Sequence, residues 1–282
     1  MKFTTLISVS GLSQNYNNPN WAVVDCRFWL DDTEKGRRDY SASHIPGAIY
    51  AHLDEHLCSP IVVGKTGRHP LPPVREFVDR LGAWGVGNDT QVVAYDDRGG
   101  MIAGRLWWML RWLGHENVAV LDGGFPAWIS EGHPVDRAIP NPEPRTFTPH
   151  LQPEMVVDVE DILAHFGDPG HMLIDSRAAE RYRGENETID PVAGRIPGAR
   201  NHFWSDNLDS DSHFEIKDVL RGRFETLFGD IPASNVTFYC GSGVSAAHNV
   251  LAVAHAGLGI PKLYAGSWSE WITDPERPVA TG

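Results

Sequence analysis

The chain has 282 residues, 41% of them hydrophobic, and a formal net charge of −13 at pH 7. This length suits two domains of about 100–150 residues, and the acidic balance argues against nucleic acid or a membrane surface as a partner. No apolar stretch approaches the roughly 20 residues of a membrane span, and we expect no signal peptide at the amino terminus. Three cysteines suit a reducing, cytoplasmic compartment better than a disulfide framework.

The predicted elements begin with short apolar runs that end in polar residues. WAVVDC, QVVAYD and VAVLDG are continuous apolar stretches of this kind, which is typical of strands in a parallel sheet buried on both faces. RLWWMLRWLGH and SAAHNVLAVAHAGL are predicted to be helices that connect such strands. Gly114 and Gly257 stand where helices commonly end in a glycine.

One sequence pattern occurs twice along the chain, with its segments in the same order and at a nearly constant offset. We therefore expect an α/β fold with two tandem domains, each a parallel sheet flanked by helices. The matching segments are Val23–Asp32 with Leu173–Tyr182, His44–Tyr50 with Arg195–Asn201, Val92–Leu110 with Val236–Ala254, and Val120–Ile129 with Leu263–Ile272.

A proline-rich stretch separates the two copies. The segment Pro134–Glu154 holds six prolines and shows no hydrophobic periodicity. Because proline fixes φ and removes an amide donor, this segment should be extended and lie on the surface. The sequence predicts a first domain over residues 1–140, a linker over 141–154 and a second domain over 155–282.

Cys240 lies at the end of an apolar strand, directly before a glycine-containing loop and a helix start. Ligands of open α/β sheets bind beyond the carboxyl ends of strands. Gly241 and Gly243 would let successive N–H groups point at one anion, and a helix that begins near Ser245 would add positive potential. Both effects lower the pKa of a thiol. Ser242 can donate a hydrogen bond, and Ser245 is expected to cap the helix.

The duplicate helps to separate this interpretation from a simpler one, in which Cys240 is a small buried hydrophobe. Asp96 holds the equivalent place in the first copy. A packing thiol does not usually exchange with a carboxylate, so this place is expected to lie at a cleft in both copies. Cys26 and Cys58 precede no such loop, and we expect them to be inert.

The repeat pair, the HIPGA turn, the DSR strand end and the CGSGVSA loop resemble the tandem-domain rhodanese-like sulfurtransferases. In that family only the second domain carries the nucleophile, which the resemblance assigns to Cys240. The loop is similar to the Cys-Gly-Ser-Gly-Val-Thr loop of the 3-mercaptopyruvate enzymes, whereas thiosulfate-preferring members carry an Arg-Lys pair after the cysteine. The resemblance implies donor contacts for the loop residues Gly241, Gly243, Val244 and Ser245.

The implied reaction moves a sulfane sulfur from 3-mercaptopyruvate, through a persulfide on Cys240, to a thiol, thioredoxin-like or cyanide acceptor. It implies a small anionic donor and no cofactor or metal. Thiosulfate remains open as the donor, and a non-catalytic sulfur-relay or binding module remains open as a function. A phosphatase of the same fold needs arginine at the sixth position from the cysteine, where Ala246 stands.

A carboxylate donor needs a cationic anchor, and arginine suits it best. Arg181 matches a substrate-binding arginine of the family, and Arg183 lies two residues further on. The alternative for both is a solvated surface position. The family's second arginine is missing, because Asp190 stands near its expected place; Arg195 is a candidate replacement.

His69 and Asp54 align with a histidine and an acid that form a proton relay with the loop serine, here Ser242, in 3-mercaptopyruvate enzymes. The alternative is that both are polar loop residues. His52, Asp54 and His56 alternate in a way that resembles a metal site, but no further ligand cluster supports one. The repeated pairs Asp25/Arg27 and Asp175/Arg177 are expected to be structural ion pairs.

Overall fold

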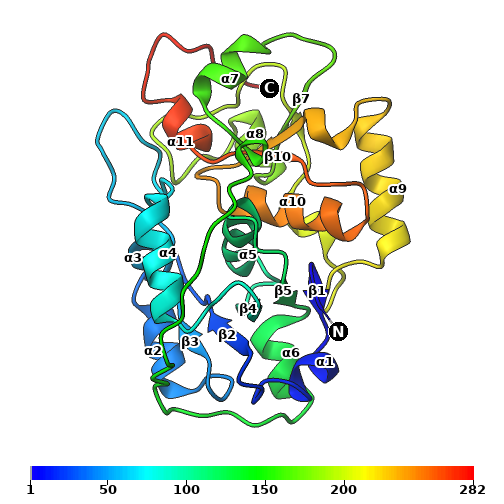
Figure 1. Ribbon diagram of the computed structural model, residues 1–282. Helices are drawn as coiled ribbons and strands as arrows, with labels where there is room; N and C mark the ends of the chain where they lie inside the picture. Colours follow the sequence, from blue (N-terminus) through cyan, green and yellow to red (C-terminus); the bar gives the residue numbers. More distant parts are fainter. Residues whose placement is uncertain (1) are drawn as a thin grey trace. The chain divides into compact units, whose positions relative to one another are not determined.

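The computed structural model describes residues 2–282 (Figure 1). They form two compact units. The first comprises residues 2–59, 71–152 and 210–214, and the second comprises residues 60–70, 153–209 and 215–282. The short segment 60–70 therefore belongs to the second unit, although it precedes much of the first unit in the sequence.

The first unit is built on a five-stranded parallel sheet in the order β1-β5-β4-β2-β3. Its middle strand β4 is buried at all five positions, as a continuous apolar run predicts for a strand covered on both faces. The strands are β1 (Leu6–Ile7), β2 (Trp21–Asp25), β3 (Ile49–Tyr50), β4 (Gln91–Tyr95) and β5 (Val118–Leu121).

Helices flank this sheet. The most extensively buried of them, α5, buries eight consecutive residues, Ala103–Leu110, and it ends before Gly114, whose φ of +79° is the left-handed conformation expected of a helix-terminating glycine. The helices of this unit are α1 (Val9–Ser13), α2 (Lys35–Ala42), α3 (Leu53–His56), α4 (Val74–Ala83), α5 (Ala103–Trp112) and α6 (Gly124–Ser130).

The second unit repeats this topology, with a five-stranded parallel sheet in the order β6-β10-β9-β7-β8. The correspondence of the two strand orders confirms the duplicated α/β architecture expected from the sequence. The strands are β6 (Val156–Val157), β7 (Met172–Asp175), β8 (Arg200–Asn201), β9 (Val236–Tyr239) and β10 (Lys262–Tyr264). The α-helices are α7 (Val159–Ala164), α8 (Ala179–Arg183), α9 (Lys217–Phe228), α10 (Ser245–His255) and α11 (Ser267–Trp271), and short 3₁₀ turns are η1 (Pro153–Met155), η2 (Trp204–Asn207) and η3 (Ala233–Asn235).

Residues 137–152 form neither helix nor strand. They nevertheless contact the rest of the first unit, to which they belong, at defined points. The backbone N–H of Arg145 donates to the carbonyl of Gly82, and its guanidinium donates to the carbonyl of Pro19. An extended chain with fixed proline dihedrals thus follows the surface of that unit.

A buried ion pair follows the equivalent strand of each sheet. Arg27 binds the Asp25 carboxylate at 2.6 Å, and Arg177 binds the Asp175 carboxylate at 2.7 Å. Each guanidinium also donates to a backbone carbonyl just before the IPGA turn, at Ser43 and Gly194 respectively. The pairs therefore have the structural role expected of them, because each ties a strand end to the following turn. In the part of the chain that the structure describes, no helix has the length and apolar character needed to cross a membrane.

Candidate functional site

Cys240 directly follows β9 and comes before the loop that leads into α10 (orange in Figure 1). Its backbone is held on both sides, because its N–H donates to the hydroxyl of Ser267 at 3.1 Å and its carbonyl accepts from the N–H of Trp268 at 3.0 Å. The residue is only 2% exposed. The start of α11 thus fixes the position from which the thiol enters the loop.

The thiol of Cys240 lies in a cradle of hydrogen-bond donors. Burial alone raises its pKa, but hydrogen bonds from the Ser245 hydroxyl and from the backbone N–H groups of Ser242, Ala246 and Gly243 lower the pKa below the usual value of a cysteine. The N–H of Gly243 lies 3.1 Å from the sulfur. The loop therefore stabilises a thiolate, as the sequence predicted.

The two glycines of the loop differ in backbone conformation, and only Gly243 has the conformation expected of both. Gly243 has a φ of +76°, and a Cβ there would lie 2.3 Å from the carbonyl oxygen of Ala265, so only glycine fits. Gly241 does not have a positive φ, and its smallness instead leaves room for Arg68 and Arg181. The requirement for glycine geometry at Gly241 was therefore wrong.

The expected helix cap was also wrong. The N-cap of α10 is Val244, and Ser245 is the first residue of the helix. Its hydroxyl makes a hydrogen bond to the Cys240 thiol, and the residue does not serve as the cap. Cys26 and Cys58 are buried outside any such loop: burial raises the pKa of Cys26 well above its usual value, and it raises that of Cys58 to about 11 in spite of a hydrogen bond from Arg105, which agrees with their expected inertness.

The hydroxyl of Ser242 meets a histidine. His69 Nδ1 lies 2.7 Å from Ser242 Oγ, and both residues are buried. His69 comes from the segment 60–70, which belongs to the same unit as the loop. Asp54 lies in the first turn of α3, in the other unit, and its part in a relay stays a prediction.

Arg181 lies on α8, and its guanidinium binds two buried carboxylates. Its Nε donates to Glu187, and its Nη2 lies 2.9 Å from both Glu187 and Asp190. A methyl group built on Gly241 would lie 3.5 Å from that Nη2 atom, so the guanidinium flanks the cysteine loop.

The other two candidate arginines have different partners. Arg183 is 40% exposed and pairs with Glu185. Arg195 donates to the carbonyls of Tyr182 and Gly282. Among residues 2–282 neither makes a hydrogen bond to the loop, and assistance from either stays a prediction.

Sequence reasoning missed Arg68. Its backbone N–H donates to Ser269 Oγ at 3.0 Å, its Nη1 pairs with Asp190, and its Nη2 would lie 2.7 Å from a methyl group on Gly241. Burial lowers the pKa of this guanidinium, and the negative Cys240 sulfur opposes that effect. The only signal in the sequence was its position next to His69.

Comparisons with known proteins identify the family of the chain. A family model described as "Rhodanese-like domain" matches residues 8–131 and 158–274. The chain belongs to the tandem-domain rhodanese-like sulfurtransferase family. This rhodanese-like chain is 46% identical over 283 residues to a Pseudomonas aeruginosa protein named "Probable 3-mercaptopyruvate sulfurtransferase", with all of both chains covered.

Two further relatives place the chain within this family. A thiosulfate sulfurtransferase from Mus musculus is 33% identical and is matched over 99% of this chain and 96% of its own length. The solved structure of a 3-mercaptopyruvate sulfurtransferase from Leishmania major superposes with a TM-score of 0.84 at 32% identity, covering 95% of this chain and 74% of that one.

In the first rhodanese-like domain, a carboxylate occupies the equivalent loop. Asp96 accepts hydrogen bonds from the backbone N–H groups of Arg98, Gly100, Ile102 and Ala103 at 2.8–2.9 Å. The loop is thus an anion cradle in both copies, but in the first copy the anion is a carboxylate and not a thiolate.

One group of residues resembles a metal site by proximity, namely Glu34, His52 and Glu55. His52 Nδ1 accepts backbone N–H groups from Asp54 and Glu55, so its Nε2 carries the proton and donates to the carbonyl of Thr33. Glu55 pairs with Arg37. The histidine therefore presents no lone pair to a metal ion.

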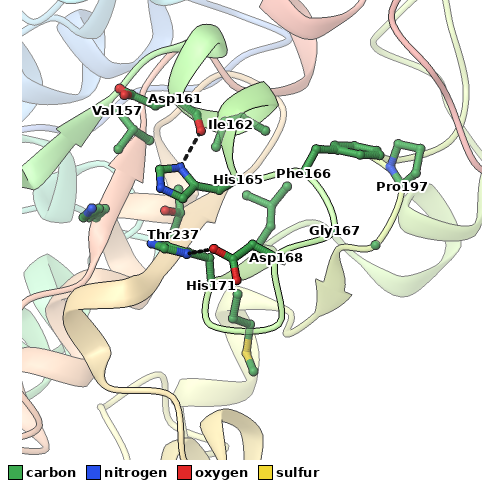
Figure 2. A pocket seen from close by; sticks show the side chains of 14 residues that line it. Val157, Asp161, Ile162, His165, Phe166, Gly167, Asp168, His171, Pro197 and Thr237 are labelled. Carbon is green, nitrogen blue, oxygen red and sulfur yellow. Dashed lines mark hydrogen bonds and ion pairs between the residues drawn. The ribbon is translucent and has the colours of Figure 1, made fainter.

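A cavity of about 290 Å³ lies at the opposite ends of the strands of the second domain. Its lining includes the first residues of β7 and β10, Met172 and Lys262. Figure 2 shows His171 paired with Asp168 and His165 bonded to the Asp161 carbonyl at its rim. None of the expected site residues lines it, so the cysteine loop remains the candidate active site.

Proposed function

We propose that this protein transfers a sulfur atom from 3-mercaptopyruvate to a thiol acceptor through a persulfide on Cys240. The observation that carries the proposal is the cradle of three N–H groups and one hydroxyl that lowers the pKa of this thiol. The 46% identity to a protein named as such an enzyme supports the choice of donor.

In the first step, the Cys240 thiolate attacks the sulfur of the donor thiol. A sulfur–sulfur bond forms, the carbon–sulfur bond of the donor breaks, and its electron pair passes into the enolate of pyruvate. In the second step, an acceptor thiolate attacks the outer sulfur of the persulfide, and the Cys240 thiolate leaves. The same N–H groups stabilise the negative sulfur before and after each step.

The pyruvate enolate needs a proton to become pyruvate. Ser242 and His69 supply one in this proposal, because their 2.7 Å contact places a hydroxyl of the loop against an imidazole. Arg181 binds the donor carboxylate. The loop itself, with Gly241 and Ser242 after the cysteine, brings no charged side chain toward the donor.

Thiosulfate is the second candidate donor, since relatives named thiosulfate sulfurtransferase match nearly the whole chain. With thiosulfate, the attacked sulfur is the outer one, and sulfite leaves with the electron pair. The choice between the donors rests on the charge of the site.

The test is to incubate the protein with each donor and to measure intact mass and turnover. We expect the mass to rise by one sulfur atom, the extra atom to map to Cys240, and Cys240→Ser to abolish both the mass gain and pyruvate release. Cys58→Ser, at a buried cysteine whose pKa is raised to about 11, is the matched control and should react normally. Full transfer activity in Cys240→Ser would overturn the proposal.

A further inference from the structure

Two guanidinium groups share one carboxylate beside the cysteine loop. Arg68 and Arg181 both bind Asp190, and both flank Gly241, the residue after the nucleophile. The Asp190 side chain is only 2% exposed, whereas those of Arg68 and Arg181 are 24% and 18% exposed. An anion that approaches Cys240 would therefore meet the arginines, with the carboxylate behind them.

Arg68 has donors left over for such an anion. Of its side-chain nitrogens, only Nη1 has a hydrogen bond among residues 2–282, and its buried Nε has no partner there. Its Nη2 lies on the side of Gly241. A guanidinium with unused donors beside a nucleophile is suited to bind a carboxylate or an oxyanion.

The surrounding charges balance. Arg181 also binds Glu187, which binds Arg177, which in turn binds Asp175. With Arg68 and Asp190, the cluster holds three arginines and three carboxylates. It has no net charge, so it offers hydrogen-bond donors to the anionic sulfur substrate without a surplus of positive potential.

We propose that Arg68 is the second cationic anchor for the sulfur donor and that Asp190 sets the charge of this anion site. The neutral cluster favours a singly charged carboxylate thiol over doubly charged thiosulfate. This inference rests on the proposed function of the same loop, and it assigns specificity to two residues from distant parts of the sequence.

Alkylation of Cys240 tests the charge of the site without any turnover. Iodoacetate carries one negative charge and iodoacetamide none, and both form the same carbon–sulfur bond with loss of iodide. A change in the thiolate fraction affects both reagents equally, so the ratio of their rates reports local charge alone. Mass spectrometry of the peptide that contains Cys240 gives both rates.

We expect opposite effects from the two substitutions. Asp190→Asn leaves one surplus positive charge and should raise the iodoacetate-to-iodoacetamide ratio about tenfold, whereas Arg68→Ala should lower it by about the same factor. The double variant restores neutrality, and its ratio should return close to that of the wild type. A merely structural role for the Arg68–Asp190 pair would leave the ratio unchanged in all three.

The same variants should change donor preference. For Asp190→Asn, kcat/KM should rise for thiosulfate about tenfold more than for 3-mercaptopyruvate, because thiosulfate carries one more negative charge. For Arg68→Ala, most of the loss should lie in KM. Glu185→Gln and Arg223→Ala, which remove one exposed charge each from the same unit, are the matched controls.

The outcomes separate the two proposals. An unchanged alkylation ratio in both single variants would overturn the anion site, whatever the enzyme activity. If neither donor transfers sulfur but the ratio responds as expected, the site binds anions and the proposed function is wrong. If the ratio responds and thiosulfate gains nothing in Asp190→Asn, Asp190 does not set donor specificity.

Discussion

Replacing Ser245 by alanine tests whether a single hydroxyl controls the nucleophile. Among the hydrogen bonds that lower the pKa of Cys240 against the effect of burial, the one from this hydroxyl has the largest effect. Ser245→Ala removes one oxygen atom and keeps a residue that is favourable at the first position of α10. The helix should therefore form as before, while the thiolate loses one of its four donors.

The size of the effect follows from the charge of the acceptor. A hydrogen bond to an ionised group contributes about 1.5–3 kcal/mol, so its loss should raise the pKa of Cys240 by about one unit or more. The rate of iodoacetamide alkylation of Cys240, measured from pH 5 to pH 10, should follow a curve displaced to higher pH. Above both midpoints the variant and the wild type should react at similar rates, because both are then fully ionised.

Thr226→Ala is the matched control, because it also removes one hydroxyl from a helix of the second unit. The Thr226 hydroxyl donates to the carbonyl of Gly222. Its alkylation curve should coincide with that of the wild type. A Ser245→Ala curve that superposes on the wild-type curve would refute the reasoning, since the backbone N–H groups alone would then account for the lowered pKa. A displacement toward lower pH would refute it as well.

Two further predictions concern the first unit. Asp96→Ala leaves four N–H groups, three of them buried, without this acceptor and should lower the free energy of unfolding by about 3–5 kcal/mol in urea titrations, whereas Asp89→Ala at an exposed site should not; equal stabilities would contradict the cradle. Burial, with the charge of Arg80, lowers the pKa of His56 to about 4. An unfolded histidine titrates near pH 6.5, so the free energy of unfolding should fall as the pH is lowered from about 6.5 to 4. His56→Gln should reduce that fall by about 2 kcal/mol, and an unchanged pH dependence would exclude the effect.

The fold was readable from the sequence because each signal was local and appeared twice. Buried strands such as β4 and β9 are continuous apolar runs, and Gly114 and Gly257 end their helices in the left-handed conformation at the expected places. A second copy in the same order left little freedom for the topology. The cysteine loop was readable for the same reason, since its donors lie within six residues of Cys240.

The rest of the site depends on contacts between distant residues. Arg68 meets Asp190 across 122 positions of the sequence, and His69 meets Ser242 across 173. No periodicity encodes such contacts, and a resemblance suggested only the second. The direction of the Ser245 hydroxyl was misjudged because a serine at a helix start usually caps the backbone, whereas here an ionised sulfur is the stronger acceptor.

The two copies of the loop show why only one of them can be a nucleophile. In the first, the carboxylate of Asp96 already takes four N–H groups, and the residue is 1% exposed, so these four donors are not available to a reacting anion. In the second, the anion is a polarizable sulfur that can form and break a bond while the donors stay in place. The cradle is thus a device for stabilising negative charge in both units. Its chemistry depends on whether the charge sits on an oxygen that satisfies the loop or on a sulfur that reacts.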